Sequence, residues 1–175
     1  LSCDFTTKIV NYKGFDIILG NPPYVCSKKM LESTKTILRN WSVCSTGHPD
    51  LYIPFIQMAM ENLSKDGIMG YITVNSFIKS LNGRALRQYL QEKRKLIHIV
   101  DFRGKQIFRS RTTYTCLLFI EHKDSDVLYY KIQDNQFLDS PHQYSQFYYA
   151  DLNFFAGWNL NQTSKIQYLE NIGTP

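Results

Sequence analysis

The sequence Phe15-Asp16-Ile17-Ile18-Leu19-Gly20-Asn21-Pro22-Pro23-Tyr24 joins a short apolar run to a stiff polar turn. The almost continuous apolar run is typical of a strand that is covered on both faces of a parallel sheet. Consecutive prolines stiffen the turn because each has a fixed φ and no N–H to donate. Ligands of open parallel sheets bind just beyond the carboxyl ends of the strands. The turn at residues 21–24 is therefore a candidate binding site.

Apolar runs and amphipathic helical patterns alternate downstream of this turn. Apolar spacings of three and four predict helices over residues 50–64 and 82–94. Residues 65–67 are expected to end the first helix, and the basic side chains of the second are expected to point outward. The predicted strands cover residues 68–74, 97–102, 114–121 and, more weakly, 127–132. This alternation predicts an α/β fold with right-handed crossovers, in which the strands over 15–19 and 68–74 are neighbours.

Two segments show neither pattern. Residues 25–48 carry Lys28, Lys29, Lys35 and Arg39, and a loop of that length inside a domain is usually functional or mobile. Residues 135–175 are rich in Gln, Asn, Tyr and Phe, which is typical of a connector to a further domain.

The composition excludes several classes of protein. Of the 175 residues 43% are hydrophobic and 20% charged, which excludes wholesale disorder, and no apolar run is long enough to span a membrane. The cysteines at 3, 26, 44 and 116 lack metal-ligand spacing, so neither a zinc site nor a disulfide scaffold is expected. A reducing cytosol is the simplest location. No signal peptide is visible in the sequence. Because it begins without an initiator Met and ends without a recognisable terminal element, we expect a piece of a longer protein.

Positive charge is concentrated in one block. Residues 79–111 contain ten Lys or Arg and two acidic residues, a local charge of +8 within a chain of net charge +5. Such a block favours a polyanionic partner. The alternative is a solvated helix face with ordinary lysines.

The polar groups of the turn suit a planar ligand with an exocyclic amine. The Asn21 side-chain oxygen and the Pro22 carbonyl would accept both amine hydrogens, while the Tyr24 ring stacks on the ligand. A rigid turn with a satisfied Asn and a packed Tyr is the structural alternative.

Residues 15–24 resemble the catalytic motif of the amino-methyltransferases, which transfer a methyl group from S-adenosylmethionine to nitrogen. Residues 50–52, 67–77, 83–87 and 99–102 resemble one subgroup, the adenine-N6 DNA methylases of restriction–modification systems, including fused type IIG enzymes. The resemblance covers roughly residues 1–122. It implies the C-terminal half of a Rossmann-like methyltransferase sheet, with a reversed strand over 114–121. Residues 123–175 would form a connector and the beginning of a DNA target-recognition domain.

The resemblance implies roles for individual residues. Asn21, Pro22, Pro23 and Tyr24 match the catalytic motif. Tyr24 and Phe108 would stack on a target adenine that has been flipped out of the duplex. Arg109 and Arg111 are the best candidates for contacts with DNA phosphates. The residues expected beside the cofactor's adenine are Asp4, Phe5, Asn21 and Phe55, with core packing an equal alternative for Phe55. No metal ion is expected.

The family's glycine-rich loop, which holds the methionine end of S-adenosylmethionine, is absent from this sequence. We therefore expect an incomplete cofactor site, weak or no cofactor binding and no activity of this chain alone. The Phe15 strand would leave an exposed sheet edge, through which we expect dimerisation or poor solubility of the chain. The expected partner is double-stranded DNA, with no membrane, in a bacterial or archaeal cytoplasm.

Three functions remain open. The first is a site-specific DNA adenine-N6 methyltransferase of a restriction–modification system. The second is a methyltransferase that acts on protein glutamine or on RNA, and the third is an inactive nucleic-acid-binding module of methylase-like fold. The basic block and the continuation of the chain past residue 122 favour the first.

Overall fold

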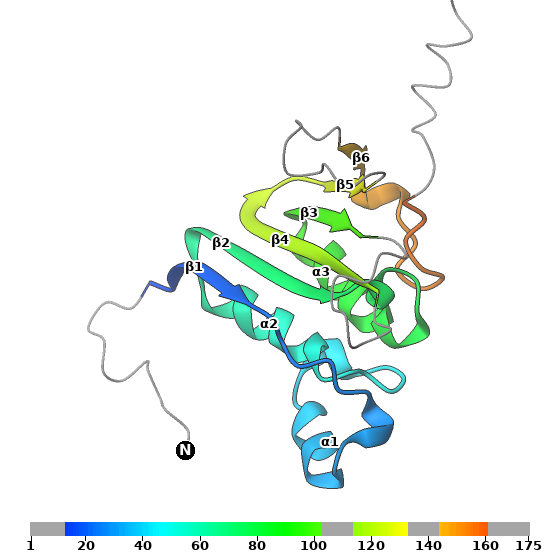
Figure 1. Cartoon of the computed structure of the whole chain (residues 1–175). Coiled ribbons are helices and arrows are strands. Elements are labelled where there is room, and N and C mark those ends of the chain that lie inside the picture. Colours follow the sequence, from blue (N-terminus) through cyan, green and yellow to red (C-terminus); the bar gives the residue numbers. More distant parts are fainter. Residues whose placement is uncertain (1–12, 103–113, 133–143, 161–175) are drawn as a thin grey trace, which may run out of the picture.

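The computed structural model describes residues 13–102, 114–132 and 144–160. A six-stranded mixed sheet of order β1-β2-β4-β3-β5-β6 forms its centre (Figure 1). The parallel strands are β1 (Phe15–Gly20), β2 (Leu63–Val74), β3 (Lys95–Asp101) and β5 (Val127–Lys131). The reversed strands are β4 (Thr115–Asp124) and β6 (Ser145–Phe147). The predictions that β1 and β2 are parallel neighbours and that β4 is reversed are confirmed, whereas β6 was not predicted.

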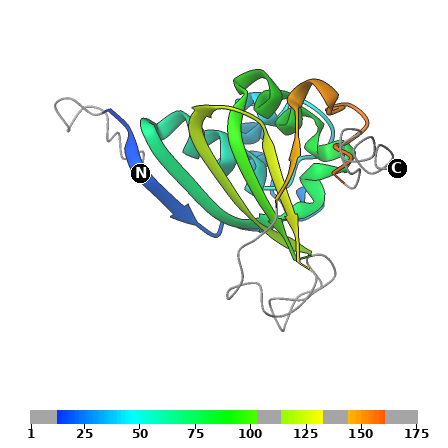
Figure 2. The same cartoon turned by 90° about the horizontal axis from the view of Figure 1, so that it is seen from above.

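Two helices connect the parallel strands and lie on one side of the sheet (Figure 2). Helix α2 (Tyr52–Asn62) joins β1 to β2, and α3 (Arg84–Lys93) joins β2 to β3. The shorter helical elements are η2 (Ser27–Lys29), α1 (Glu32–Leu38), η3 (Ser42–Cys44), η4 (Asn75–Ile78), η5 (Leu81–Gly83) and η6 (Tyr149–Asp151).

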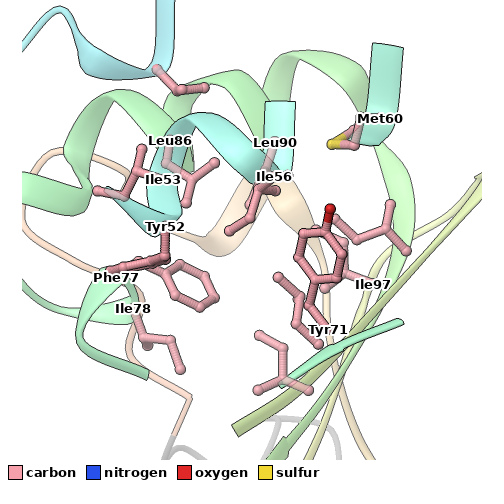
Figure 3. Packing of buried hydrophobic residues seen from close by; sticks show 14 of the residues in the cluster. Tyr52, Ile53, Ile56, Met60, Tyr71, Phe77, Ile78, Leu86, Leu90 and Ile97 are labelled. Carbon is pink, nitrogen blue, oxygen red and sulfur yellow. The ribbon is translucent and has the colours of Figure 1, made fainter. Parts of the chain in front are cut away.

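The strand register separates the two faces of the sheet. One row across the strands consists of Ile18, Met69, Ile120, Ile97 and Val127, and all but Ile18 are fully buried beneath the helices. Because side chains alternate along a strand, the next row points to the opposite face. There Leu19 is 75% exposed. The core thus lies between the sheet and α2 and α3, where Tyr52, Tyr71, Phe77 and Ile97 pack together (Figure 3).

Strand β1 differs from the prediction of a strand covered on both faces. It lies at the edge of the sheet, and Ile17 and Leu19 are 64% and 75% exposed. Only its other face, which carries Ile18, packs against the core. Within the described ranges, no element covers the face of Ile17 and Leu19.

The boundary between α2 and β2 also differs from the prediction. The helix ends at Asn62 and the strand begins at Leu63, so residues 65–67 lie inside the strand. Phe15 is paired with Leu63 but Ile17 with Ile68, which makes residues 64–67 a bulge. Glycine is required there, because a Cβ on Gly67 would lie 2.7 Å from the Phe15 carbonyl oxygen.

Residues 25–50, which we call the lobe, are an ordered unit rather than a loop. They contain η2, α1 and η3, and Figure 1 shows α1 projecting from the sheet. Met30, Leu38, Val43 and Cys44 are buried and continuous with the main core. These helices have seven residues or fewer, too few for a helical period to show in the sequence.

Residues 144–160 pack onto the same body as the sheet. Strand β6 pairs with β5, while Tyr149 and Trp158 are buried in the main core. Strand β4 continues through residue 122 to Asp124, and β5 follows in the same sheet. The assignment of residues 123–175 to a connector and recognition domain stays a prediction.

Candidate functional site

Polar residues lie at the carboxyl ends of three parallel strands, of which β1 and β2 are neighbours and β3 is separated from β2 by the reversed strand β4. Asn21 comes directly after β1, Asn75 directly after β2, and Asp101 is the last residue of β3. These strands are parallel, so their carboxyl ends meet at the same edge. The prediction that Asn21 lies at the carboxyl end of its strand is confirmed.

The side chain of Asn21 is available to a ligand. Asn21 is exposed, and its amide has no hydrogen-bond partner in the described part of the chain. Pro22 is buried whereas Pro23 is exposed, so the turn is anchored through the first proline. A fixed backbone with a free amide can accept hydrogen bonds from a substrate without first breaking its own.

The ring of Tyr24, three residues after Asn21, is anchored to β2 by its hydroxyl group. Tyr24 is half-buried, and its hydroxyl donates a 2.8 Å hydrogen bond to the Ile72 carbonyl of β2. Burial, with a smaller contribution from Cys116, raises the pKa of Tyr24 to about 12. Tyr24 is therefore a neutral hydrogen-bond donor at ordinary pH, and its ring has a defined position at the carboxyl edge.

Tyr71 links α2 to the end of β1. Its hydroxyl donates a long hydrogen bond of 3.5 Å to the backbone carbonyl of Phe55, a half-buried residue of α2. Tyr71 is the register partner of Gly20. A Cβ on Gly20 would lie 2.9 Å from the Tyr71 ring, so a larger residue there would displace this ring.

A polar cleft at the carboxyl edge was missed by the sequence analysis. It has a volume of about 250 Å³, and its lining includes Asn75, Asp101 and Tyr129. The Asp101 carboxylate accepts hydrogen bonds from the Asn75 amide at 2.9 Å and from the Tyr129 hydroxyl at 2.7 Å. The signal that could have found Asn75 and Asp101 is the one that found Asn21, a polar residue at the end of an apolar strand.

The buried cysteines are not suited to nucleophilic chemistry. Cys116 is fully buried, and burial followed by the charge of Asp101 raises the pKa of its thiol. Burial raises the pKa of Cys44 to about 12. A thiol must ionise to react, so both behave as inert packing residues.

The structure describes five of the predicted site residues. Asn21, Pro22, Pro23 and Tyr24 directly follow β1, and Phe55 on α2 is connected to the end of β1 through its backbone carbonyl and Tyr71. The other predicted site residues lie outside the described residues; these are Asp4, Phe5, Phe108, Arg109 and Arg111. Within residues 13–102, 114–132 and 144–160, no group of three or more His, Cys, Asp or Glu side chains could hold a metal ion, and no helix is long and apolar enough to cross a membrane.

One member of the predicted basic block does not face outward. Arg87 is fully buried and donates hydrogen bonds to the carbonyls of Phe77, Ser80 and Phe154. The prediction that the basic side chains of this helix are all solvated is therefore wrong for Arg87. Its guanidinium group joins segments far apart in the sequence, which a helical pattern cannot reveal.

The chain is similar to known restriction–modification proteins. The family model described as Eco57I restriction-modification methylase matches residues 3–108. The type II restriction enzyme and methyltransferase RM.Eco57I of Escherichia coli is 35% identical over 130 residues, which cover 72% of this chain and 13% of that protein. The chain therefore spans about an eighth of this relative's length.

Solved structures share the fold. A nuclease-deletion mutant of the type ISP restriction–modification enzyme LlaGI, in complex with a DNA substrate mimic, has a TM-score of 0.59 at 18% identity over 89% of this chain and 19% of that one. A proposed class I S-adenosylmethionine-dependent methyltransferase of Listeria monocytogenes has a TM-score of 0.53 at 15% identity over 76% of this chain and 40% of that one. The match of the family model over more than half of the sequence shows that the chain belongs to the Eco57I restriction-modification methylase family.

Proposed function

We propose that this chain is the C-terminal half of the catalytic sheet of a DNA adenine-N6 methyltransferase that acts on a flipped-out adenine in double-stranded DNA. Two observations carry the proposal: Asn21 is exposed and its amide has no hydrogen-bond partner among the described residues, and the ring of Tyr24, three residues later, is anchored to β2. Membership of the Eco57I family supports the restriction–modification context.

The turn would activate the adenine amine by hydrogen bonding. An aromatic amine is a poor nucleophile because its lone pair is delocalised into the ring. Accepting both amine hydrogens, by the Asn21 side-chain oxygen and the Pro22 carbonyl, favours a pyramidal nitrogen with a localised lone pair. Alignment and electrostatic support of the charge that develops on nitrogen are then the main contributions of the protein. No general base is required, in keeping with the side chains of residues 21–24.

Tyr24 would hold the target base after it leaves the duplex. A base inside the helix is inaccessible to the reaction, so it must be extruded and stabilised by stacking. The hydrogen bond from the Tyr24 hydroxyl to Ile72 keeps one stacking surface in place before the base arrives. Phe108 is proposed as the second stacking surface, and Arg109 and Arg111 as phosphate contacts.

S-adenosylmethionine would supply an activated methyl group on its sulfonium. Phe55 and Asn21 are proposed to flank the adenine of this cofactor, because Phe55 is half-buried on α2 and Asn21 is exposed directly after β1. Asp4 and Phe5 are proposed to complete this side of the site. The sequence holds no glycine-rich loop for the methionine end, so we propose that this chain alone binds the cofactor weakly and is inactive.

The exposed strand β1 supports the proposal of a half sheet. Ile17 and Leu19 are apolar and more than 60% exposed, which is costly for an edge strand in water. We propose that further strands cover this edge in the parent protein, and that the isolated chain dimerises through it. Residues 123–175 are proposed to lead into the recognition domain.

The test uses the full-length parent and duplex DNA. Asn21→Ala should lower the rate of methyl transfer by about 100- to 1000-fold, the cost of removing one transition-state hydrogen-bonding group. DNA binding should change less than about twofold. The control is Asn62→Ala, which removes the same side chain from the last residue of α2, before the amino end of β2. N6-methyladenine in the digested product would support the adenine assignment.

Two outcomes would reject the proposal. The first is near-normal turnover by Asn21→Ala. The second is methylation of a glutamine peptide or of RNA in preference to DNA by the unaltered parent, which would select the alternative substrates.

A further inference from the structure

The lobe contains a cationic pocket that the methyl-transfer site does not use. The pocket has a volume of about 470 Å³, and Lys35, Arg39 and His48 line it. None of its described lining residues is Asp or Glu. Residues 25–50 carry four Lys or Arg and two acidic residues, so the lobe as a whole is also positive.

The two sides of the pocket differ in chemistry. The hydroxyls of Ser27 and Ser45 join the cationic side chains, whereas Met30 and Leu38 supply an apolar wall. The volume falls within the range of about 300–1,000 Å³ that is usual for small-molecule sites. A ligand with an anionic group and a less polar body would match both sides.

The cationic groups are available to an anion. Arg39 is exposed and forms no ion pair in the described part of the chain. Lys35 pairs with Glu32 at 2.7 Å, but the Glu32 side chain is 79% exposed. Exposed pairs are weak because water screens them, so Lys35 can turn to a ligand at small cost.

The lobe is closed by one backbone hydrogen bond and is held to α2 and η5 by two more bonds. Its ends are closed by the bond from Leu51 N to the Val25 carbonyl, at 2.9 Å. Val43 N donates to the Gln57 side chain of α2 at 3.2 Å, and His48 N donates to the Asn82 side chain of η5 at 3.0 Å. The pocket is therefore formed before any ligand binds.

We propose that this pocket binds a phosphodiester group of the DNA strand that carries the target nucleotide, with the adjoining sugar against Met30 and Leu38. The proposal rests on DNA as the substrate class. Ser27, which lines the pocket, follows Tyr24 by three residues, so at most about 11 Å of chain separates it from the proposed base-stacking residue. Phosphate contacts fix the register of a nucleic acid without reading its sequence, which is the role this pocket would have.

The experiment measures DNA binding by the complete 175-residue chain as a function of salt. A fluorescein-labelled duplex is titrated in an anisotropy assay from 50 to 200 mM salt, roughly the range over which phosphate contacts dominate the salt dependence. The variant is Lys35→Gln/Arg39→Gln. The control is Lys13→Gln/Lys65→Gln, which removes two exposed lysines near the amino ends of β1 and β2.

The pocket variant should lower the slope of log K against log[salt] by about 1 for each DNA phosphate that the protein no longer neutralises. The control should leave the slope unchanged, and both variants should retain the circular dichroism spectrum of the unaltered 175-residue chain. Equal slopes in the variant and the control would overturn the proposal, as would tighter binding of RNA than of DNA of the same sequence. Absence of DNA binding by the unaltered chain would also overturn it.

These outcomes are separable from those of the proposed function. Normal turnover by the Asn21→Ala variant of the full-length protein would reject the methyl-transfer role of Asn21. The salt dependence of DNA binding would still report on the pocket. Conversely, an unchanged slope would reject the pocket and leave the role of Asn21 intact.

Discussion

The two edge strands of the sheet, β1 and β6, differ in length and in how far the rest of the chain covers them. At the β6 edge the strand has three residues, and residues 148–160 fold back so that Tyr149 and Trp158 are buried. At the β1 edge the strand has six residues, and Ile17 and Leu19 point into solvent. Short edge strands are a common protection against strand pairing between molecules, and long apolar edges are a liability.

Polar groups of α3 explain why the β6 side is closed. Gln91 donates to the carbonyls of Tyr149 and Leu152 at 2.9 Å and accepts from the Trp158 indole at 3.2 Å. Arg87, one turn earlier, donates to Phe154. No comparable set of bonds lies along the outer side of β1 in the described ranges. Residues 148–160 therefore cover the sheet at β6, whereas β1, the strand that leads into the candidate site, stays exposed.

Trp158→Ala should have the largest effect. Trp158 is fully buried, so its truncation should lower the free energy of unfolding by about 3–5 kcal/mol. Urea denaturation followed by circular dichroism measures the loss. Phe155→Ala is the control, because Phe155 is 59% exposed in the same segment. Similar losses for both variants would show that residues 148–160 do not close this edge.

Arg87→Met should lower the free energy of unfolding by about 1–3 kcal/mol, because it removes three hydrogen bonds from the guanidinium to backbone carbonyls. Of these carbonyls, that of Ser80 keeps a further backbone donor, Gly83 N. Arg84→Met, which loses one exposed hydrogen bond and a ring contact with Phe155, should cost less than about 1 kcal/mol. The same urea titration compares them. If Arg87 were an outward DNA contact, its substitution would affect DNA affinity and leave stability unchanged.

Ile17→Lys/Leu19→Lys should change the free energy of unfolding by less than about 0.5 kcal/mol, since both side chains are already in solvent. The double variant should nevertheless abolish self-association of the chain, because charges on an edge strand oppose pairing. Sedimentation velocity measures the oligomeric state. Gln146→Lys on β6 is the control and should leave it unchanged. A monomeric unaltered chain would remove the proposed dimerisation.

His98→Gln should have the smallest effect on stability. The strand register places His98 in the middle of the sheet, on the same face as Leu19. Burial lowers the pKa of His98 below its ordinary value of 6.5; Glu121 opposes this shift and Lys123 adds to it. A lowered pKa means that the unfolded chain binds the proton more readily. The His98 contribution is therefore fully present above pH 6.5 and is lost as the pH falls through the folded pKa. Urea titrations from pH 8 to pH 5 should show that the free energy of unfolding falls more steeply with decreasing pH for the unaltered chain than for His98→Gln. The same pH dependence in both would indicate that water reaches His98 freely on this face of the sheet.

The candidate turn was predictable because its chemistry is local. Proline restricts its own backbone, and an apolar run that ends in Gly20-Asn21-Pro22-Pro23 identifies a strand and its carboxyl end without reference to the rest of the chain. The alternation of strands and helices likewise predicted the neighbours β1 and β2. The positions of the basic side chains were less predictable, because exposure depends on what packs against a helix.

The order of residues is enough to place a rigid Asn-Pro-Pro-Tyr turn at the carboxyl end of the first described strand of an α/β sheet. It is not enough to bury Arg87, to shape residues 25–50 into a pocket, or to bring Asn75, Asp101 and Tyr129 into one cleft. Each of these depends on contacts between segments far apart in the chain. Residue patterns report the periodicity of one element, whereas the partner of a side chain is set by which elements the fold brings beside it.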